Sequence, residues 1–392
     1  MNKIYFDNAA TTPVAEEVFE QMQNYFKNEY GNPSSIYSFA RNAKNAVDDA
    51  RASVARLIGA DAGRIIFTGS GTEADNWAIK GVAEACANKG NHIITTAFEH
   101  HAVLHTCEYL EKKGYEVTYL PVSKNGLVSA EDVAKAIKPT TILITVMFAN
   151  NEIGTIQPIA EIGSIARDRG VLFHTDAVQA VGHIPIDVKQ MNIDLLSMSA
   201  HKIYGPKGVG ALYVGRNVKL PSFLHGGGQE YGKRAGTENV AGIAGFGKAA
   251  ELALEGMTRE TSRVLALRER LVDGVLNTIP HSRLNGDRAK RLPGNASFIF
   301  EFIEGESVLL MLDMKGFCAS SGSACTSGSL DPSHVLLSIG LPHELAHGSL
   351  RLTLGKFNTE QEVDQLLEIL PGVVDKLRQM SPLYEDYCRN QQ

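Results

Sequence analysis

The sequence predicts an α/β protein whose large part is a mostly parallel sheet covered by helices, followed by a smaller α+β part. Two observations favour this fold class. Short apolar, strand-like runs alternate with helical stretches up to Val214, and the pattern changes after Thr278. The length of 392 residues also exceeds the usual size of one hydrophobic core, so we expect two domains.

The large part begins with two helices, over about Val14–Lys27 and Ala40–Ile58, separated by a Gly-Asn-Pro loop. Seven apolar runs then predict the strands of one sheet: Ile65–Thr68, His92–Thr96, Glu116–Leu120, Thr141–Phe148, Val171–Thr175, Asp194–Ser199 and Val209–Val214. Helical patterns lie between most of them, for example at Glu73–Asn88, Ala130–Ile137 and Ile159–Arg169. Ligands of such sheets bind at the carboxyl ends of the strands.

A long helical stretch follows Asn239 and continues to about Thr278. After it we expect strands at Ser297–Phe302, Gly316–Ala319 and Ser349–Leu354, with helices at about Ser307–Met314 and Thr359–Met380. We therefore assign residues 14–255 to the large domain. Residues 1–13 and 256–392 are assigned to the small one, with the strand-like opening around Ile4 packing against it.

Composition narrows the possible functions. The net charge is −6 and the pI is about 6.1, so no basic footprint indicates nucleic-acid binding. No apolar run reaches the roughly 18 residues of a membrane span, and the first residues lack an apolar signal region, so we expect a cytoplasmic protein. Five scattered cysteines do not resemble a disulfide framework, so at least one of them could be a reactive thiol.

Lys202 is the first candidate for chemistry. It stands in Ser199-Ala200-His201-Lys202, where one apolar run stops and a Gly-Pro turn leads to the next. A lysine at the mouth of a strand can lose its proton and form an imine with a carbonyl compound. The alternative is a solvated loop lysine.

A possible phosphate site precedes it in the chain. The strand at 65–68 ends in Gly69-Ser70-Gly71-Thr72, where a helix begins, and free N–H groups at a helix start bind anions. The segment matches neither the Walker loop nor the dinucleotide fingerprint. The alternative is an ordinary helix start with Thr72 as the N-cap.

Asp176 ends another apolar run, in His174-Thr175-Asp176-Ala177. A carboxylate at a strand end can pair with a protonated pyridine nitrogen, as pyridoxal phosphate (PLP) requires of its site. The alternative is an N-cap aspartate. A phosphate cup, a strand-end acid and a strand-end lysine in this order resemble the site of PLP enzymes with the aspartate aminotransferase fold (fold type I).

Cys325 is the candidate nucleophile. It lies in Ser320-Ser321-Gly322-Ser323-Ala324-Cys325-Thr326-Ser327-Gly328, a run of small polar residues typical of a loop that presents a thiol. The alternative is a structural loop with an incidental cysteine. The other cysteines are expected to be structural or incidental: Cys86, Cys107, Cys318 and Cys388.

Taken together, the motifs resemble those of the cysteine desulfurases of the NifS and IscS type, over nearly the whole chain. The motifs that carry the resemblance are 7–13 (DNAATTP), 31–35 (GNPSS), 99–100 (EH), 150–154 (NNEIG), 174–179 (HTDAVQ), 199–208 and 320–328. The resemblance implies the fold-type-I architecture and PLP as cofactor. It also implies a homodimer.

Roles of single residues follow from the resemblance alone. Lys202 would hold the cofactor through an imine and move the Cα proton, while Asp176 and Gln179 would bind the ring nitrogen and the phenolate oxygen. His100 would stack on the ring and transfer protons. The phosphate ligands would be Gly71, Thr72, Ser199 and His201, with Thr237 from the neighbouring subunit. Substrate contacts would come from Arg351, Asn151 and Asn32.

The implied reaction converts L-cysteine to L-alanine. The thiolate of Cys325 attacks the substrate sulfur and keeps it as a persulfide, which is passed to an iron–sulfur scaffold or another acceptor protein. The alternative is a selenocysteine lyase or another PLP-dependent lyase of the same fold. We expect no metal ion, although His343-Glu344-Leu345-Ala346-His347 matches a zinc pattern, because Pro342 and Gly348 leave little room for a helix there.

Overall fold

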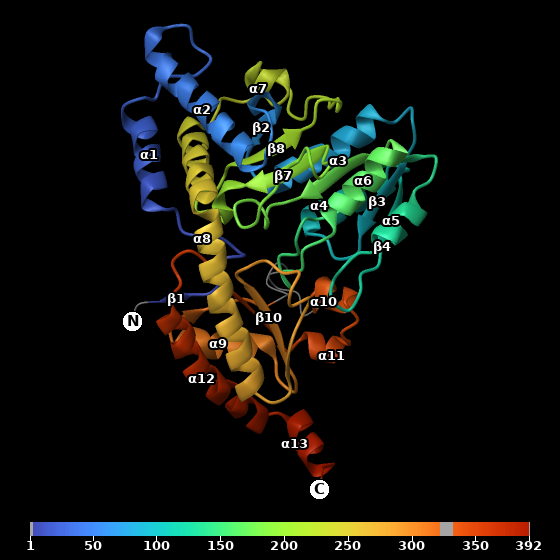
Figure 1. Cartoon of the computed structure of the whole chain (residues 1–392), viewed down its shortest axis with the longest axis vertical. Coiled ribbons are helices and arrows are strands. Elements are labelled where there is room, and N and C mark those ends of the chain that lie inside the picture. Colours follow the sequence, from blue (N-terminus) through green and yellow to red (C-terminus); the bar gives the residue numbers. More distant parts are fainter. Residues whose placement is uncertain (1–2, 322–331, 392) are drawn as a thin grey trace.

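The computed structural model describes residues 3–321 and 332–391. Its larger part contains α1 (Glu16–Lys27), α2 (Arg41–Leu57), β2 (Ile65–Thr68), α3 (Gly71–Ala85), β3 (His92–Thr96), α4 (His101–Glu111), β4 (Glu116–Leu120), α5 (Ala130–Ala136), β5 (Thr141–Thr145), α6 (Ile159–Arg169), β6 (Leu172–Asp176), β7 (Leu195–Ser199), β8 (Gly210–Val214) and α7 (Gln229–Gly232). The helix α8 (Val240–Thr278) then runs from the larger part down into the smaller one (Figure 1).

The predicted seven-stranded sheet is confirmed. Its strand order is β2-β8-β7-β6-β5-β3-β4, and β8 is antiparallel to both of its neighbours while the other pairs are parallel. Two strands have different ends from those predicted: β5 stops at Thr145, and β6 extends to Asp176. Beyond β5 the chain still follows its neighbour, because Val146 and Phe148 donate N–H groups to the carbonyls of His174 and Asp176.

Alternation along each strand separates two apolar faces. On β7, Leu195 packs with α3 and α4, whereas Leu196 packs with α2, α6 and α8. On β2, Ile66 and Phe67 divide in the same way. Successive side chains of a strand point to opposite faces, so the sheet is covered by helices on both sides, as predicted.

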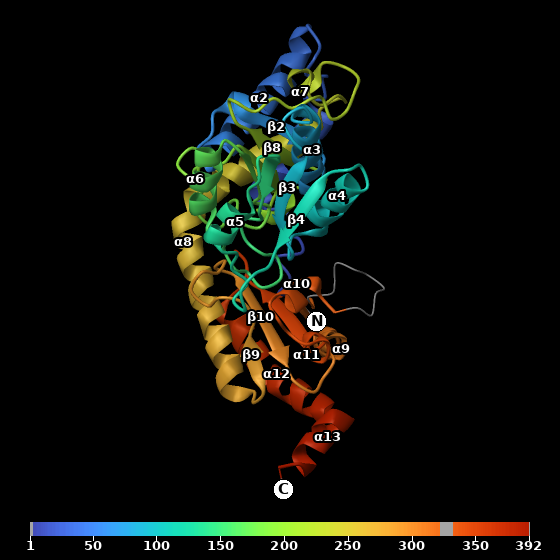
Figure 2. The same ribbon diagram turned by 90° about the vertical axis from the view of Figure 1, so that its right-hand side faces the viewer.

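The smaller part contains β1 (Ile4–Tyr5), β9 (Ser282–Leu284), β10 (Asn295–Phe300), α9 (Gly305–Met314), β11 (Phe317–Cys318), α10 (His334–Ser338), α11 (His343–Ala346), β12 (Ser349–Thr353), α12 (Glu360–Gln379) and α13 (Pro382–Arg389). The strands β12, β10 and β9 form an antiparallel sheet, and β1 pairs with β11 in parallel. Figure 2 shows this part below the large sheet, with α8 along one side.

Each part has its own core. One cluster joins α2, α6 and the upper half of α8 to the large sheet, and another joins Phe6 and the lower half of α8 to β10, β12 and α12. The helix α8 crosses the predicted domain boundary at residue 255 without a break. The division into residues 14–255 and the remainder therefore stays a prediction. No helix among the described residues is long and apolar enough to cross a membrane.

A buried ion pair fixes the edge of the large sheet. Both Nη atoms of Arg51 on α2 donate to the carboxylate of Glu230, at 2.7 and 2.8 Å, and Glu230 also accepts the N–H of Phe67 on β2. The two side chains are 7% and 4% exposed. Removing one partner of such a pair leaves an uncompensated buried charge.

We predict that Glu230→Gln lowers the free energy of unfolding by about 3 kcal/mol, because it leaves the buried guanidinium of Arg51 without a negative partner. Urea unfolding followed by circular dichroism measures the loss. Asp61→Asn is the matched control: its partners Lys189 and Arg216 are solvent-exposed, so the unfolding midpoint should barely move. Equal midpoints for the two variants would contradict the assignment.

Candidate active site

A cavity of about 400 Å³ opens at the carboxyl edge of the large sheet. It collects residues from the ends of β6 and β7, the start of α3, the opening of the chain and β12. Its lining residues are Asp7, Ala9, Ala10, Ser70, Gly71, Thr72, Asp75, His100, Met147, Ala149, Asn151, Asp176, Val178, Gln179, Ser199, His201, Lys202, Ser320 and Arg351. Most of the predicted site residues therefore meet here.

Lys202 ends a single turn of 3₁₀ helix (Ala200–Lys202) that follows β7 directly. Its Nζ lies 2.5 Å from the carbonyl oxygen of Ala9 and 2.7 Å from that of Ala10, so the opening segment of the chain closes over the amine. The backbone carbonyl of Lys202 contacts Nε2 of His183 at 3.0 Å. Lys202 is therefore not a solvated loop lysine, because its amine is bound by two backbone carbonyl groups.

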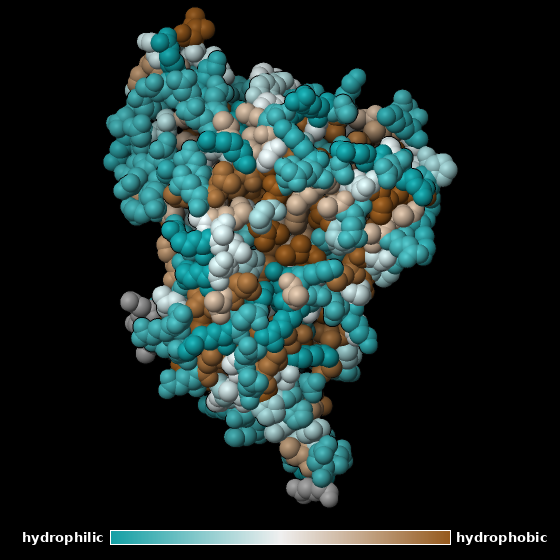
Figure 3. All heavy atoms as spheres, viewed as in Figure 1, coloured by the Kyte–Doolittle hydropathy of each residue, from teal (hydrophilic) through white to brown (hydrophobic). Residues whose placement is uncertain are grey.

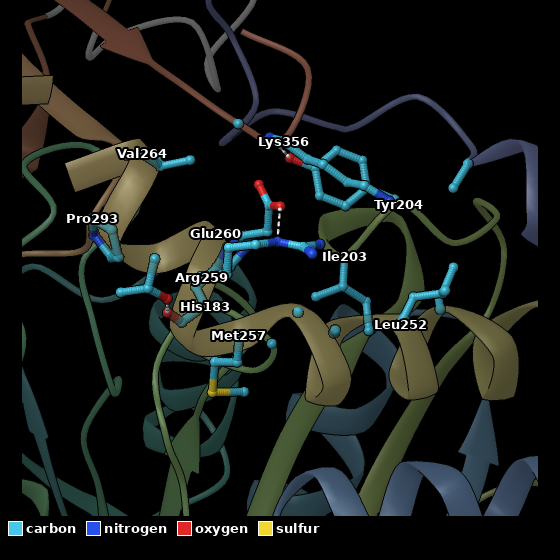
Figure 4. Close-up of a pocket in the computed structure, with 18 of the residues that line it drawn as sticks. His183, Ile203, Tyr204, Leu252, Met257, Arg259, Glu260, Val264, Pro293 and Lys356 are labelled. Atoms are coloured by element: carbon cyan, nitrogen blue, oxygen red, sulfur yellow. Dashed lines mark hydrogen bonds and ion pairs between the residues drawn. The ribbon is translucent and has the colours of Figure 1, made fainter. Parts of the chain in front are cut away.

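A second cavity, of about 290 Å³, lies next to the residues that follow Lys202 (Figure 4). Ile203 and Tyr204 line it together with α8, and so does His183, which holds the main chain of Lys202. The side chain of Lys202 does not line it. This cavity is therefore a neighbour of the lysine's main chain, separate from the cavity that contains its amine.

Asp176 is the last residue of β6 and is buried. One carboxylate oxygen accepts the N–H of Val178 at 2.9 Å, within a turn, so the alternative of a helix N-cap is wrong. Burial raises the pKa of Asp176, and His100 and Lys202 act in the opposite direction. His100 and Lys202 thus favour the ionised carboxylate, which is the form that pairs with a pyridinium nitrogen.

His100 is the residue before α4, and its Nδ1 accepts the N–H of Ala102 at 3.1 Å. Burial lowers the pKa of His100. A neutral imidazole that accepts at Nδ1 carries its proton on Nε2. His100 can therefore donate a proton from Nε2 at the cavity.

The start of α3 supplies the predicted anion cup. Ser70, rather than Thr72, is the N-cap, and its hydroxyl accepts the N–H of Glu73. A Cβ at Gly71 would lie 2.6 Å from the side chain of Val178, so a side chain here would force its neighbour to move. Gly71 and Thr72, the first two residues of the helix, line the cavity, where their N–H groups could bind a phosphate.

Three further predicted residues line the cavity and form hydrogen bonds there: Gln179, Arg351 and Asn151. Gln179 donates to the carbonyl of Ala9 at 3.0 Å. Arg351 donates to the carbonyl of Asn151 at 3.1 Å and to the carboxylate of Asp7 at 3.0 Å. The Nε of Arg351 is buried without a hydrogen-bond partner, so the guanidinium still has a donor to offer a ligand.

Two predicted residues lie elsewhere, and a third falls outside the described part of the chain. Thr237 lines a separate small pocket with Arg234 and Gly236, and Asn32 lies in the loop between α1 and α2, where its side chain accepts the N–H of Ser34. Neither lines the main cavity. Thr237 was expected to serve a neighbouring subunit, whereas Asn32 was expected to contact the substrate beside Arg351, and both roles stay predictions. Cys325 lies outside the described residues.

Sequence reasoning missed the acids around the cavity. Asp7 pairs with Arg351, and Asp75 and Glu99 are buried at or beside the floor. A signal existed for Asp75, because it is an acid among the apolar residues of α3, next to Ala74 and one turn before Ala78. An unpaired acid on the inner face of a helix is rare enough to indicate a site.

The residues present fit PLP. An amine, a buried carboxyl group and a helix start with a required glycine surround one cavity, which supplies an imine partner, a ring-nitrogen partner and a phosphate cup. His201, with Nδ1 3.1 Å from the hydroxyl of Thr11, and Ser199 lie beside the cup. Burial lowers the pKa of His201 to about 4, so it would meet a phosphate as a neutral donor.

Comparison with known proteins agrees with this geometry. Residues 4–366 match the family model of the class-V aminotransferases. The cysteine desulfurase IscS of Clostridium botulinum (strain Hall) is 59% identical over 100% of both chains, and that of Methanosarcina thermophila is 57% identical over 97% of this chain and 94% of its own. The solved structure of a NifS-like protein superposes with a TM-score of 0.90 at 38% identity, covering 96% of this chain and 100% of the other. Members of the class-V family use PLP, and this chain belongs to that family, within the group of cysteine desulfurases of the IscS type.

Proposed function

We propose that the protein converts L-cysteine to L-alanine and keeps the sulfur as a persulfide on Cys325. The observation that carries the proposal is where the segment with Cys325 leaves and re-enters the described structure. Ser320 lines the cavity and exchanges backbone hydrogen bonds with Arg351 of 2.7 and 3.2 Å. On the other side of residues 322–331, Ser333 donates its hydroxyl to buried Glu152, the sequence neighbour of the cavity residue Asn151. One flank of the segment therefore lines the cavity, and the other is held beside a residue that adjoins it.

The substrate carboxylate would bind Arg351, whose planar guanidinium has an unpartnered Nε and shares another donor with Asp7. When bound through Lys202, PLP supplies the electron sink that makes the Cα proton of the amino acid acidic. Asp176 would hold the proton on the ring nitrogen. Gly71, Thr72, Ser199 and His201 would hold the phosphate.

Proton movements would fall to two residues. The amine of Lys202, once released by the substrate amine, takes the Cα proton, and His100 donates or accepts at its Nε2. The thiolate of Cys325 then attacks the substrate sulfur: an S–S bond forms, the substrate C–S bond breaks, and its electron pair stays on carbon. Protonation of that carbon completes the methyl group of alanine.

A homodimer is part of the proposal. Thr237 and Asn32 lie outside the cavity of their own chain, and the loop that contains Asn32 is flanked by exposed apolar side chains: Phe26, Tyr30, Ile36, Tyr37 and Phe39. The tip of this segment is apolar at the upper end of Figure 3. Burial of such a surface against a second copy would bring both residues to the partner's cavity.

The persulfide would then pass to an acceptor protein, for which we propose an iron–sulfur scaffold or another sulfur carrier. We also propose that the protein works in the cytoplasm, as the sequence predicts.

Cys325→Ser should reduce alanine formation from L-cysteine by roughly 100-fold or more, because a hydroxyl is a far weaker nucleophile than a thiolate. Cys318→Ser is the matched control, on β11 outside the cavity, and should keep most of the activity. Alanine release and binding of PLP are measured for both. Full alanine production by Cys325→Ser would favour a lyase that releases its product directly, such as a selenocysteine lyase.

A hybrid dimer tests the shared site. We expect Lys202→Ala and Thr237→Ala homodimers each to be impaired, the first in chemistry and the second in PLP affinity. A dimer with one chain of each kind contains one intact site, made of Lys202 from one chain and Thr237 from the other, and should recover about half of the wild-type activity per dimer. Hybrids with no more activity than the mean of the two homodimers would contradict the arrangement.

A further inference from the structure

A buried polar cluster lies under the floor of the cavity, on the face of the sheet that packs against α3. Thr145, His174 and Ser197 come from the adjacent strands β5, β6 and β7, and Asp75 comes from α3. His174 is two residues before Asp176 and therefore points to the same face of β6. All four side chains are buried, with Asp75 only 1% exposed.

His174 cannot serve as a counter-charge in this cluster. Its Nδ1 lies 2.8 Å from the hydroxyl of Thr145, and its Nε2 lies 3.0 Å from the hydroxyl of Ser197. Both ring nitrogens are thus bound to neutral groups, and burial lowers the pKa of His174 to about 3. The 3.6 Å approach of Nε2 to Oδ1 of Asp75 is therefore not an ion pair at neutral pH.

Asp75 has little to stabilise a negative charge. Within the described residues, His174 is the one basic group at ion-pair distance, and Oδ1 of Asp75 has no hydrogen-bond partner. Burial raises the pKa of Asp75 well above its usual range. The charge of Asp176 raises it further, and a hydrogen bond with Ser197 opposes this effect.

Of the two buried aspartates, Asp176 stabilises a negative charge better than Asp75 does. It accepts the N–H of Val178 and lies near His100 and Lys202, whereas Asp75, in the part of the chain that the structure describes, has no backbone donor and no charged base at ion-pair distance. Two carboxyl groups that share a buried site cannot both ionise cheaply, so one of them keeps a proton. The backbone donor of Val178 and the nearby amine of Lys202 favour the charge on Asp176, so the proton stays on Asp75.

We propose that Asp75 is a positioning residue that holds a proton at neutral pH and thereby confines the negative charge of the cavity floor to Asp176. The role of Asp176 as partner of the ring nitrogen rests on the proposed function; the protonation of Asp75 does not. A second charge at Asp75 would push a proton onto Asp176 and weaken its hold on a cationic ring.

Infrared spectroscopy of the holoenzyme at neutral pH tests this directly. The wild type should show the carbonyl stretch of a protonated carboxyl group. This band should be missing from the spectrum of Asp75→Asn and present in that of Asp168→Asn, a control at an exposed residue of α6. Glu99 is also buried, so wild-type protein labelled with ¹³C at the aspartate side-chain carboxyl separates the two residue types: an aspartate band shifts and that from Glu99 does not. Loss of the shifted band in Asp75→Asn then assigns it to Asp75 rather than to Asp176. If Asp75→Asn fails to fold, a labelled wild type in which no band shifts still overturns the proposal.

Stability provides the second readout. A native acid that keeps its proton above the pKa of about 3.9 of the unfolded chain makes the protein less stable as pH rises, by about tenfold in the folding constant per pH unit until the native group ionises. Urea unfolding of the full chain between pH 5 and 7 should therefore show the wild type losing about 100-fold relative to Asp75→Asn, with no such change relative to Asp168→Asn.

Loss of the band on substitution, together with its shift on labelling, supports the proposal. The pH-dependent gap in stability supports it as well. A wild-type spectrum without a protonated aspartate band, or equal pH slopes for wild type and Asp75→Asn, would overturn it. Neither readout involves cysteine turnover, so a failed desulfurase assay would leave this result standing, and the reverse also holds.

Discussion

The parallel pairing of β6 with β7 is the constraint on which the site depends. Asp176 pairs with Ser197 in register, so β6 ends beside a strand that continues to Ser199 and then turns to present Lys202. The strands cannot slide by one residue, because such a slip would exchange the side chains of the two buried faces. An acid and an amine that are 26 positions apart in the chain thus reach one cavity.

The negative charge at the cavity floor depends on the surroundings of each acid. The floor contains several acidic side chains, and the groups packed around each one determine whether it is ionised. Arg351 is matched by Asp7, and Asp176 by a backbone N–H with His100 and Lys202 nearby. For Glu99, burial raises the pKa to about 8, so it too would carry its proton at neutral pH. The site keeps negative charge where a cation of the cofactor or substrate would lie, and removes it elsewhere.

Local pattern was enough to predict the seven strands, the long α8 and the three strand-end motifs, since each depends on residues adjacent in the sequence. Long-range contacts were not predictable in this way. Nothing local shows that Ala9 and Ala10 cover Lys202, or that Asp7 pairs with Arg351, 344 residues later. The N-cap at Ser70 was missed because Thr72 has the same capping chemistry two residues on, and backbone geometry decides between them. The roles of Gln179 and Thr237 came from family resemblance, because an isolated glutamine or threonine carries no signal of its own.

The proposed chemistry depends on one bond, the imine between Lys202 and PLP. Reduction of the reconstituted protein with borohydride makes that bond permanent, and peptide mapping by mass spectrometry then locates it. We expect the cofactor on the peptide that contains Lys202, with the label lost when L-cysteine is added before the reductant. A label on another lysine, or none, would contradict the assignment of this cavity as the active site.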